Sequence, residues 1–317
     1  MKNKLAIFAA LCGLFVMIAA SAQTVAACRE GLRLCVELIL PSLFPFFVLS
    51  SLLGKLGLPA MLGKRLAPLA ERLFHVTGAG CTAFLMGLLG GYPLGAAYIA
   101  ALAESGQVSD REAARLLAFC NNSGPAFFVG ALGAGVFGSV RLGLLLYAVH
   151  AAAALLTGLL FRGKSAVPGS AVLPAPPLPL SEAIPEAVRQ AVSASLNVCG
   201  FVVCFAVFTG LLDANGLLSL LAGHLHALTG QSLPWCRALL IGFFELGGGI
   251  GALRGLPPTP LNLALAAAIM GWGGLSVHFQ TLSLIADRDI KSAPHTAGRL
   301  LSAGLSFLLA CGLAFLL

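Results

Sequence analysis

The chain has 317 residues, of which 58% are hydrophobic and only 10% carry a charged side chain. Soluble domains usually carry about 25% charged residues, so this composition excludes an ordinary soluble fold. The net charge of +7 does not indicate nucleic-acid binding, because the basic residues stand singly between apolar stretches and form no basic arm. Long apolar stretches rich in Ala, Leu and Gly instead predict an all-α polytopic membrane protein embedded in a lipid bilayer.

The cysteines do not indicate a metal site. Nine are scattered along the chain, without a Cys-x-x-Cys pair or a histidine at ligand spacing. Several lie inside apolar stretches: Cys81, Cys120, Cys199, Cys204 and Cys311. Cysteines in such stretches usually serve as small buried apolar side chains, so we expect no metal, no disulfide and no cofactor.

The N-terminal segment, residues 1–24, has two interpretations. Lys2 and Lys4 precede an apolar run that ends near Ala20-Ser21-Ala22, a pattern also found in cleaved signal peptides. We favour an uncleaved first helix over residues 4–22, because the chain that follows is itself polytopic. Both interpretations leave the later topology unchanged.

The first half of the chain, residues 25–162, predicts membrane spans and one re-entrant hairpin. The spans are expected at residues 30–54, 109–137 and 141–161. An apolar stretch over residues 78–103 is interrupted in its middle by Gly90, Gly91 and Pro93. Because glycine frees the backbone and proline removes a donor, we expect this stretch to fold back on itself within the membrane.

The span over residues 109–137 has a defined start and a break. Ser109 and Glu112 form a capping box. The Ser109 hydroxyl and the Glu112 carboxylate can each accept a hydrogen bond from a free backbone amide at the start of the helix. The sequence Asn-Asn-Ser-Gly-Pro at residues 121–125 then interrupts the helix near its centre.

Residues 163–185 are proline-rich and are expected to link the halves without forming a helix, since proline removes the amide that a helix needs. The prolines are Pro168, Pro174, Pro176, Pro177 and Pro179. The second half, residues 186–317, repeats the order of the first. Its spans are expected at residues 187–212, 260–286 and 297–317, with a glycine-broken hairpin at residues 236–254.

Matching residues indicate a duplication. Three pairs of segments align at spacings of about 150 to 156 residues: Glu30–Arg33 with Glu186–Arg189, Gly87–Gly90 with Gly242–Glu245, and Asn121–Gly124 with Gly271–Gly274. This spacing is too long for a solenoid repeat and suits a duplicated transporter half.

The positive-inside rule gives the orientation of the halves. With Lys2 and Lys4 in the cytoplasm, most of the 19 Lys and Arg residues, Arg299 among them, fall on the cytoplasmic side. The outer side keeps Arg29, Arg33, Arg141, Arg237 and Arg254. This distribution favours about seven transmembrane helices plus two re-entrant hairpins. Each half then has an odd number of spans, so the repeat is inverted.

Backbone breaks inside a membrane leave amides and carbonyls that only buried protein or a polar cavity can tolerate. The residues at the breaks are Gly90, Gly91, Pro93, Gly124, Pro125, Gly247, Gly248, Gly249, Gly273 and Gly274. Polar side chains gather at the same places and are the candidate ligands of a solute or ion: Tyr92, Asn121, Asn122, Ser123, Glu245, Ser276, His278 and Gln280. The sequence therefore predicts one shared site near the midplane of the membrane.

The candidate ligands differ in how firmly they indicate function. Glu245 stands between Phe244 and Leu246, and a carboxylate there needs a cation, a proton or a donor. We favour a ligand of the solute or of a coupling Na⁺ or H⁺ over a protonated carboxyl bonded to the nearby break. Asn121 and Asn122 could equally bind solute or cap the half-helix ends. For His278, a packing role is favoured over titration during transport.

Enzymatic motifs are not found. The chain has no HExxH, GxSxG or Walker A sequence and no dinucleotide-binding glycine pattern. Ser123 lacks an evident base with a third orienting group. We therefore do not expect an enzyme.

Several segments carry a family resemblance. They are Leu40–Phe47, Gly91–Ala96, Phe119–Pro125 and Gly273–Gln280. With these the chain resembles the YlbJ-type sporulation integral membrane proteins of the nucleoside-recognition or Gate-domain group. That group is related to concentrative nucleoside transporters and to the membrane part of ferrous iron transporters.

The resemblance implies a protein of an inner, cytoplasmic or forespore membrane, linked to passage of dipicolinate, a pyridine dicarboxylate. Our first hypothesis is therefore a permease, a secondary transporter for a small polar or anionic solute. A channel-like facilitator, or a non-transporting scaffold that binds a partner protein in spore formation, would be the alternatives. The oligomeric state stays open.

Overall fold

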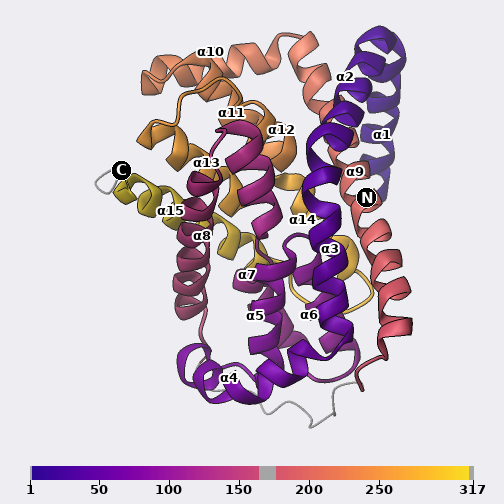
Figure 1. The fold of residues 1–317 in the computed structure, drawn as a ribbon. Helices are drawn as coiled ribbons and strands as arrows, with labels where there is room; N and C mark the ends of the chain where they lie inside the picture. The colour runs from indigo at the N-terminus through magenta and orange to yellow at the C-terminus, as the bar shows by residue number, and fades with distance from the viewer. Residues whose placement is uncertain (1, 164–175, 314–317) are drawn as a thin grey trace.

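The computed structural model describes residues 2–163 and 176–313, and every regular element in these ranges is helical (Figure 1). Five helical segments are long and apolar enough to cross a membrane: Ser21–Lys55, Val140–Leu160, Leu180–Ala214, Pro260–Leu284 and Ala293–Leu313. This confirms an all-α polytopic membrane protein.

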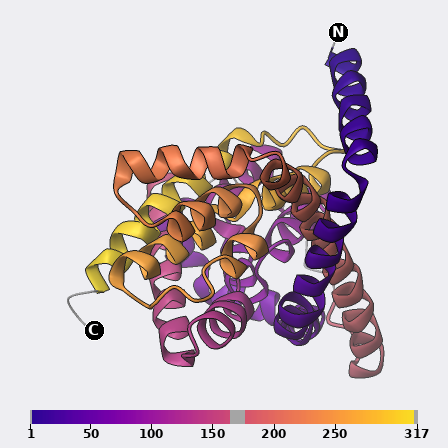
Figure 2. The same cartoon turned by 90° about the horizontal axis from the view of Figure 1, so that it is seen from above.

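Two of the seven expected spans are not among these five segments. The first is α1 (Lys2–Ala19), which turns at Ala20 into α2 (Ser21–Leu34) and projects away from the other helices (Figure 2). The second consists of two 11-residue pieces, α7 (Asp110–Cys120) and η2 (Ala126–Val136), which are separated by the expected break.

The other long helical segments are continuous. Helix α2 continues through η1 (Cys35–Ile39) into α3 (Leu40–Lys55), and this rod packs against α9 (Leu180–Ala214). Helix α8 (Val140–Leu160) packs against η2. Helix α15 (Ala293–Leu313) packs against α13, α7 and α8 and so joins the two halves of the chain.

The structure corrects the expected linker. Helix α9 begins at Leu180 and contains Pro185, so residues 180–185 are helical. Proline costs least near the start of a helix, where few amides have an intrahelical partner. Pro168 and Pro174 lie outside the described residues.

Two further helices lie across opposite ends of the molecule (Figure 1). Helix α4 (Leu58–Phe74) follows α3, and its Arg65–Phe74 portion meets α5 at 92°. Helix α10 (Leu217–Thr229) follows α9 and takes the corresponding place in the second half. Sequence patterns did not predict either helix.

Both hairpins form as expected. The first consists of α5 (Gly78–Gly90) and α6 (Leu94–Glu104), with Gly91, Tyr92 and Pro93 in the turn. The second consists of α11 (Leu233–Phe244) and the short α12 (Leu246–Gly251), joined by Glu245. The second broken helix consists of α13 (Pro260–Trp272) and α14 (Gly274–Leu284).

The capping box at Ser109 forms only in part. The Ser109 hydroxyl accepts from the Glu112 amide at 3.2 Å. The Glu112 carboxylate does not return this bond: it accepts from the Thr77 amide at 2.7 Å and from the Thr77 hydroxyl at 3.0 Å. Buried Glu112 therefore holds the start of the first hairpin against α7.

Replacing Glu112 by alanine should lower the free energy of unfolding by about 1 to 3 kcal/mol, because it leaves the Thr77 amide without its acceptor. Ser109→Ala is the matched control, since it removes only the cap of α7, worth about 1 kcal/mol. The comparison is made on thermal unfolding midpoints of the detergent-solubilised protein. A midpoint for Glu112→Ala equal to that of the wild type would contradict this role.

Candidate functional site

In each half of the chain, the turn of the hairpin lies against the break in the helix. A Cβ atom on Gly91 would lie 2.6 Å from the Gly124 backbone nitrogen, and one on Gly274 would lie 2.9 Å from the Leu246 backbone nitrogen. Gly91 and Gly274 also have positive φ angles of 73° and 78°, which side chains rarely adopt. These glycines therefore let two backbones touch at each break.

Glu245 forms the turn of the second hairpin and is 4% exposed. One carboxylate oxygen accepts from the Gly247 amide at 2.8 Å, and the other accepts from the Gly248 amide. The carboxyl group therefore caps the first turn of α12, where backbone amides favour negative charge. These two bonds offset part of the cost of burying an ionised carboxylate. They are compatible with a ligand of the solute or of a cation, and with a protonated carboxyl bonded to the break.

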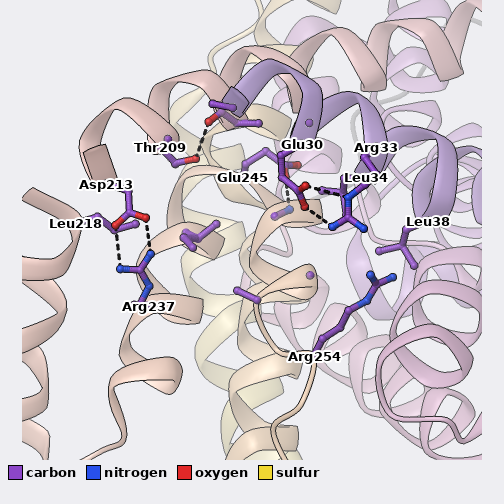
Figure 3. Close-up of a pocket in the computed structure, with 18 of the residues that line it drawn as sticks. Glu30, Arg33, Leu34, Leu38, Thr209, Asp213, Leu218, Arg237, Glu245 and Arg254 are labelled. Atoms are coloured by element: carbon purple, nitrogen blue, oxygen red, sulfur yellow. Dashed lines mark hydrogen bonds and ion pairs between the residues drawn. The ribbon is translucent and has the colours of Figure 1, made fainter. Parts of the chain in front are cut away.

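A cavity of about 360 Å³, here called the vestibule, reaches Glu245 (Figure 3). Besides Glu245, its charged lining residues are Glu30, Arg33, Glu37, Asp213, Arg237 and Arg254. Most of the acidic groups are paired: Arg33 bonds Glu30 at 2.6 Å and Glu37 at 3.1 Å, and Arg237 bonds Asp213 at 2.9 and 2.7 Å. Glu245 is the buried carboxylate of this lining.

A second, much smaller cavity of about 10 Å³, here called the inner cavity, is also lined by Glu245. Tyr92, Ser276 and Gln280 also line it. Its volume has room for about one water molecule. Glu245 borders both cavities, and the structure brings four of the expected site residues together at the inner one.

The expected ligands of the first break do not line either cavity. Asn121 is fully buried; its side-chain oxygen accepts from the Ala96 amide at 3.2 Å, and its nitrogen donates to the Thr281 hydroxyl at 2.9 Å. The Asn122 side chain donates to the Phe119 carbonyl at 2.7 Å. The Ser123 amide donates to His150 Nε2 at 3.2 Å. The geometry thus supports the capping interpretation of these asparagines.

Replacing Asn121 by alanine should lower the free energy of unfolding by about 1 to 3 kcal/mol, since the Ala96 amide would lose its buried acceptor. Asn262 is partly exposed and bonds only near its own helix start, so Asn262→Ala is the matched control. Unfolding midpoints would be compared with the KM of solute uptake. A large rise in KM at an unchanged midpoint would instead make Asn121 a solute ligand.

His278 lies among aromatic rings next to the second break. Its Nδ1 lies 2.9 Å from the Gly274 carbonyl oxygen, and its ring centroid lies 4.2 Å from that of Trp272 and 4.8 Å from that of His295. The ring therefore fills the space behind the second break and does not line the inner cavity.

Arg299 is the important residue that the sequence patterns missed. It counts among the cytoplasmic charges at the start of the span expected over residues 297–317, but α15 begins earlier, at Ala293, and Arg299 is fully buried. Its guanidinium donates to the Tyr92 hydroxyl at 3.1 Å, to the Asn122 side chain at 3.2 Å and to the Ala118 carbonyl at 2.9 Å. Pro294, which favours the first turn of a helix, was the available signal that the helix begins earlier than expected.

Comparison with known proteins decides the family. The sporulation integral membrane protein YlbJ of Bacillus subtilis (strain 168) is 33% identical to the chain over 300 residues, covering 87% of this chain and 74% of that protein. The chain belongs to the YlbJ family. Together with the spans, membership in the YlbJ family confirms a multi-pass integral membrane protein. No family model and no solved structure matches the chain, so the relation to the Gate-domain group stays a prediction.

Proposed function

We propose that this YlbJ-family protein is a permease, a secondary transporter and not an enzyme, that moves a small polar or anionic solute between its two hairpins. The observation that carries the proposal is Glu245. This buried carboxylate borders the vestibule and the inner cavity at once. Ionisable groups buried in membrane proteins usually mark solute or ion pathways.

The vestibule would be the access route on one side of the membrane. Arg33, Arg237 and Arg254, which the positive-inside rule places on the outer side, all line it. The inner cavity has room for about one water, so a solute can reach it only when the hairpin turns and the helix breaks separate. The conformation would thus be open to the outside as far as Glu245 and closed beyond it.

The arrangement of the halves supports alternating access. A hairpin turn meets a helix break twice, once in each half. Helices α4 and α10, which hold corresponding places in the chain, lie at opposite ends of the molecule (Figure 1). Halves of opposite orientation would produce this placement, and such inverted repeats let one site open to each side in turn.

The chemistry of the solute follows from the donors at the site. The N-terminus of α14 has no side-chain cap and presents backbone amides, which favour carboxylates or carbonyl groups. The YlbJ relative is named a sporulation protein, and the family resemblance implies dipicolinate as the solute. Glu245 would then hold the coupling cation, Na⁺ or H⁺, which offsets the repulsion between its carboxylate and an anionic solute.

Uptake into proteoliposomes tests the proposal. Purified protein would be screened with pyridine-2,6-dicarboxylate, a nucleoside and a divalent metal ion, with and without an imposed Na⁺ or H⁺ gradient. We expect uptake of the dicarboxylate against its own gradient when a cation gradient is imposed. Uptake that only follows the solute gradient would favour a channel-like facilitator. No uptake of any solute would contradict the proposal and favour the scaffold.

A further inference from the structure

Arg299 has the largest side chain among the fully buried residues of the described chain. It lies on a buried polar face of α15 together with His295, Ser302 and Ser306, which follow helical spacing. This face packs against α13, α7 and α8, at the junction of the two halves. The arginine is therefore enclosed by protein on every side.

Among the residues that the structure describes, none forms an ion pair with Arg299. Its three acceptors are a tyrosine hydroxyl, an asparagine side-chain carbonyl and a backbone carbonyl, all of them neutral. A buried charge without a partner is strongly unfavourable, most of all within a membrane protein. The three bonds to neutral acceptors hold α15 against the first half of the chain, but they offset only part of this cost.

The guanidinium also has bonding capacity left. Its Nε atom has no acceptor, and the Ser302 hydroxyl one turn along the helix has no partner. Arginine presents its donors in a planar fork that matches the two oxygens of a carboxylate. The surroundings of Arg299 thus suit one more acceptor, of negative charge.

Tyr92 connects Arg299 to the candidate transport site. Its hydroxyl accepts from Arg299, and its side chain lines the inner cavity together with Glu245. The ring also lies against the second break, since a Cβ on Gly273 would lie 3.1 Å from the Tyr92 hydroxyl oxygen. If the turn of the first hairpin moved away from the second break, Tyr92 would move with it. Arg299 would then reach the inner cavity.

We infer that Arg299 determines the charge specificity of transport: in the solute-bound state its guanidinium exchanges the Tyr92 hydroxyl for a carboxylate of the solute. The inference rests on the proposed function and adds the residue that selects an anion over a neutral solute of the same shape. The exchange replaces a hydrogen bond from the guanidinium to a neutral hydroxyl by one to a negatively charged carboxylate, which is stronger because both partners are then charged.

The test compares two probes of nearly equal shape, pyridine-2,6-dicarboxylate and pyridine-2,6-dicarboxamide, in proteoliposome uptake. We expect the wild type to prefer the dicarboxylate by about tenfold or more in KM, the loss expected for one charge-assisted hydrogen bond. Arg299→Gln should raise the KM for the dicarboxylate to that of the diamide. Arg299→Lys keeps the charge and should keep the order of preference.

The exposed Arg141 of α8 gives the matched control Arg141→Gln, which should leave both KM values unchanged. Equal wild-type uptake of the two probes would overturn the inference while leaving the transporter intact, as would an Arg299→Gln protein that still prefers the dicarboxylate. If Arg299→Gln does not fold, the wild type and Arg299→Lys decide the matter. Uptake of neither probe by the wild type would instead contradict the proposed function.

Discussion

Replacing Glu245 by glutamine should abolish solute uptake against a gradient while leaving the amount of folded protein in the membrane unchanged. Glutamine keeps the size of the side chain but cannot carry the negative charge that would hold a coupling cation between the vestibule and the inner cavity. The measurement is the initial rate of dicarboxylate uptake into proteoliposomes under an imposed Na⁺ or H⁺ gradient.

The controls for Glu245→Gln must separate charge from capping. Glu245 bonds two amides of α12 through its two oxygens, and glutamine has only one acceptor oxygen for them. Ser232→Ala removes the cap of the neighbouring α11 without removing a charge, and Glu37→Gln neutralises an exposed vestibule carboxylate. Both should transport nearly as well as the wild type. Full uptake by Glu245→Gln would remove Glu245 from the site.

Replacing Gly298 by alanine should lower the free energy of unfolding by about 3 kcal/mol or more, the upper range for overpacking. A Cβ atom at Gly298 would overlap the carbonyl oxygen of Ala118, so the backbones of α15 and α7 would have to separate. Because Arg299 bonds the same carbonyl, this shift would also displace its guanidinium. Expression yield and the thermal unfolding midpoint are the measurements.

The same helix supplies the control for Gly298. A Cβ atom on Gly304 meets nothing within 4 Å, so Gly304→Ala should leave the protein intact or stabilise it by up to about 1 kcal/mol, through the better helix propensity of alanine. If Gly298→Ala were as stable as Gly304→Ala, the close packing of α15 on α7 would be wrong.

The hairpins and breaks were predictable because their signals are local. Gly91 and Pro93 interrupt an apolar stretch in any environment. The second hairpin turns at Glu245, and the expected break at Gly247, Gly248 and Gly249 was wrong, because these glycines lie inside α12, whose first turn the Glu245 carboxylate caps. The ends of such elements follow from backbone chemistry that the sequence displays directly.

Arg299 and Glu112 were misjudged because their partners are distant in sequence. A charge near the end of an apolar stretch is typical of a loop, and only the packing of α15 against α7 and α8 shows that Arg299 is enclosed. In the same way, the carboxylate of Glu112 bonds Thr77 of the preceding hairpin and not the cap of its own helix. Helix α4 was not predicted for another reason. Charged residues stand among its apolar residues, so the segment does not read as a continuous apolar stretch.

The two halves, though built alike, have different chemistry at their breaks. At the first break, the side chains of Asn121 and Asn122 form hydrogen bonds with backbone groups and with the Thr281 hydroxyl. At the second break, Glu245 faces two cavities. Under the proposed function, solute and coupling ion would therefore bind at the second hairpin, and the first would have a structural role.

Counterflow in proteoliposomes tests the transporter proposal most directly. Vesicles that contain the wild-type protein would be loaded with unlabelled pyridine-2,6-dicarboxylate and diluted into a trace of the labelled compound. A carrier whose site opens to each side in turn exchanges the two, so we predict transient accumulation of label above its outside concentration, and none with Glu245→Gln. Label that only equilibrates, or does not enter at all, would contradict a permease.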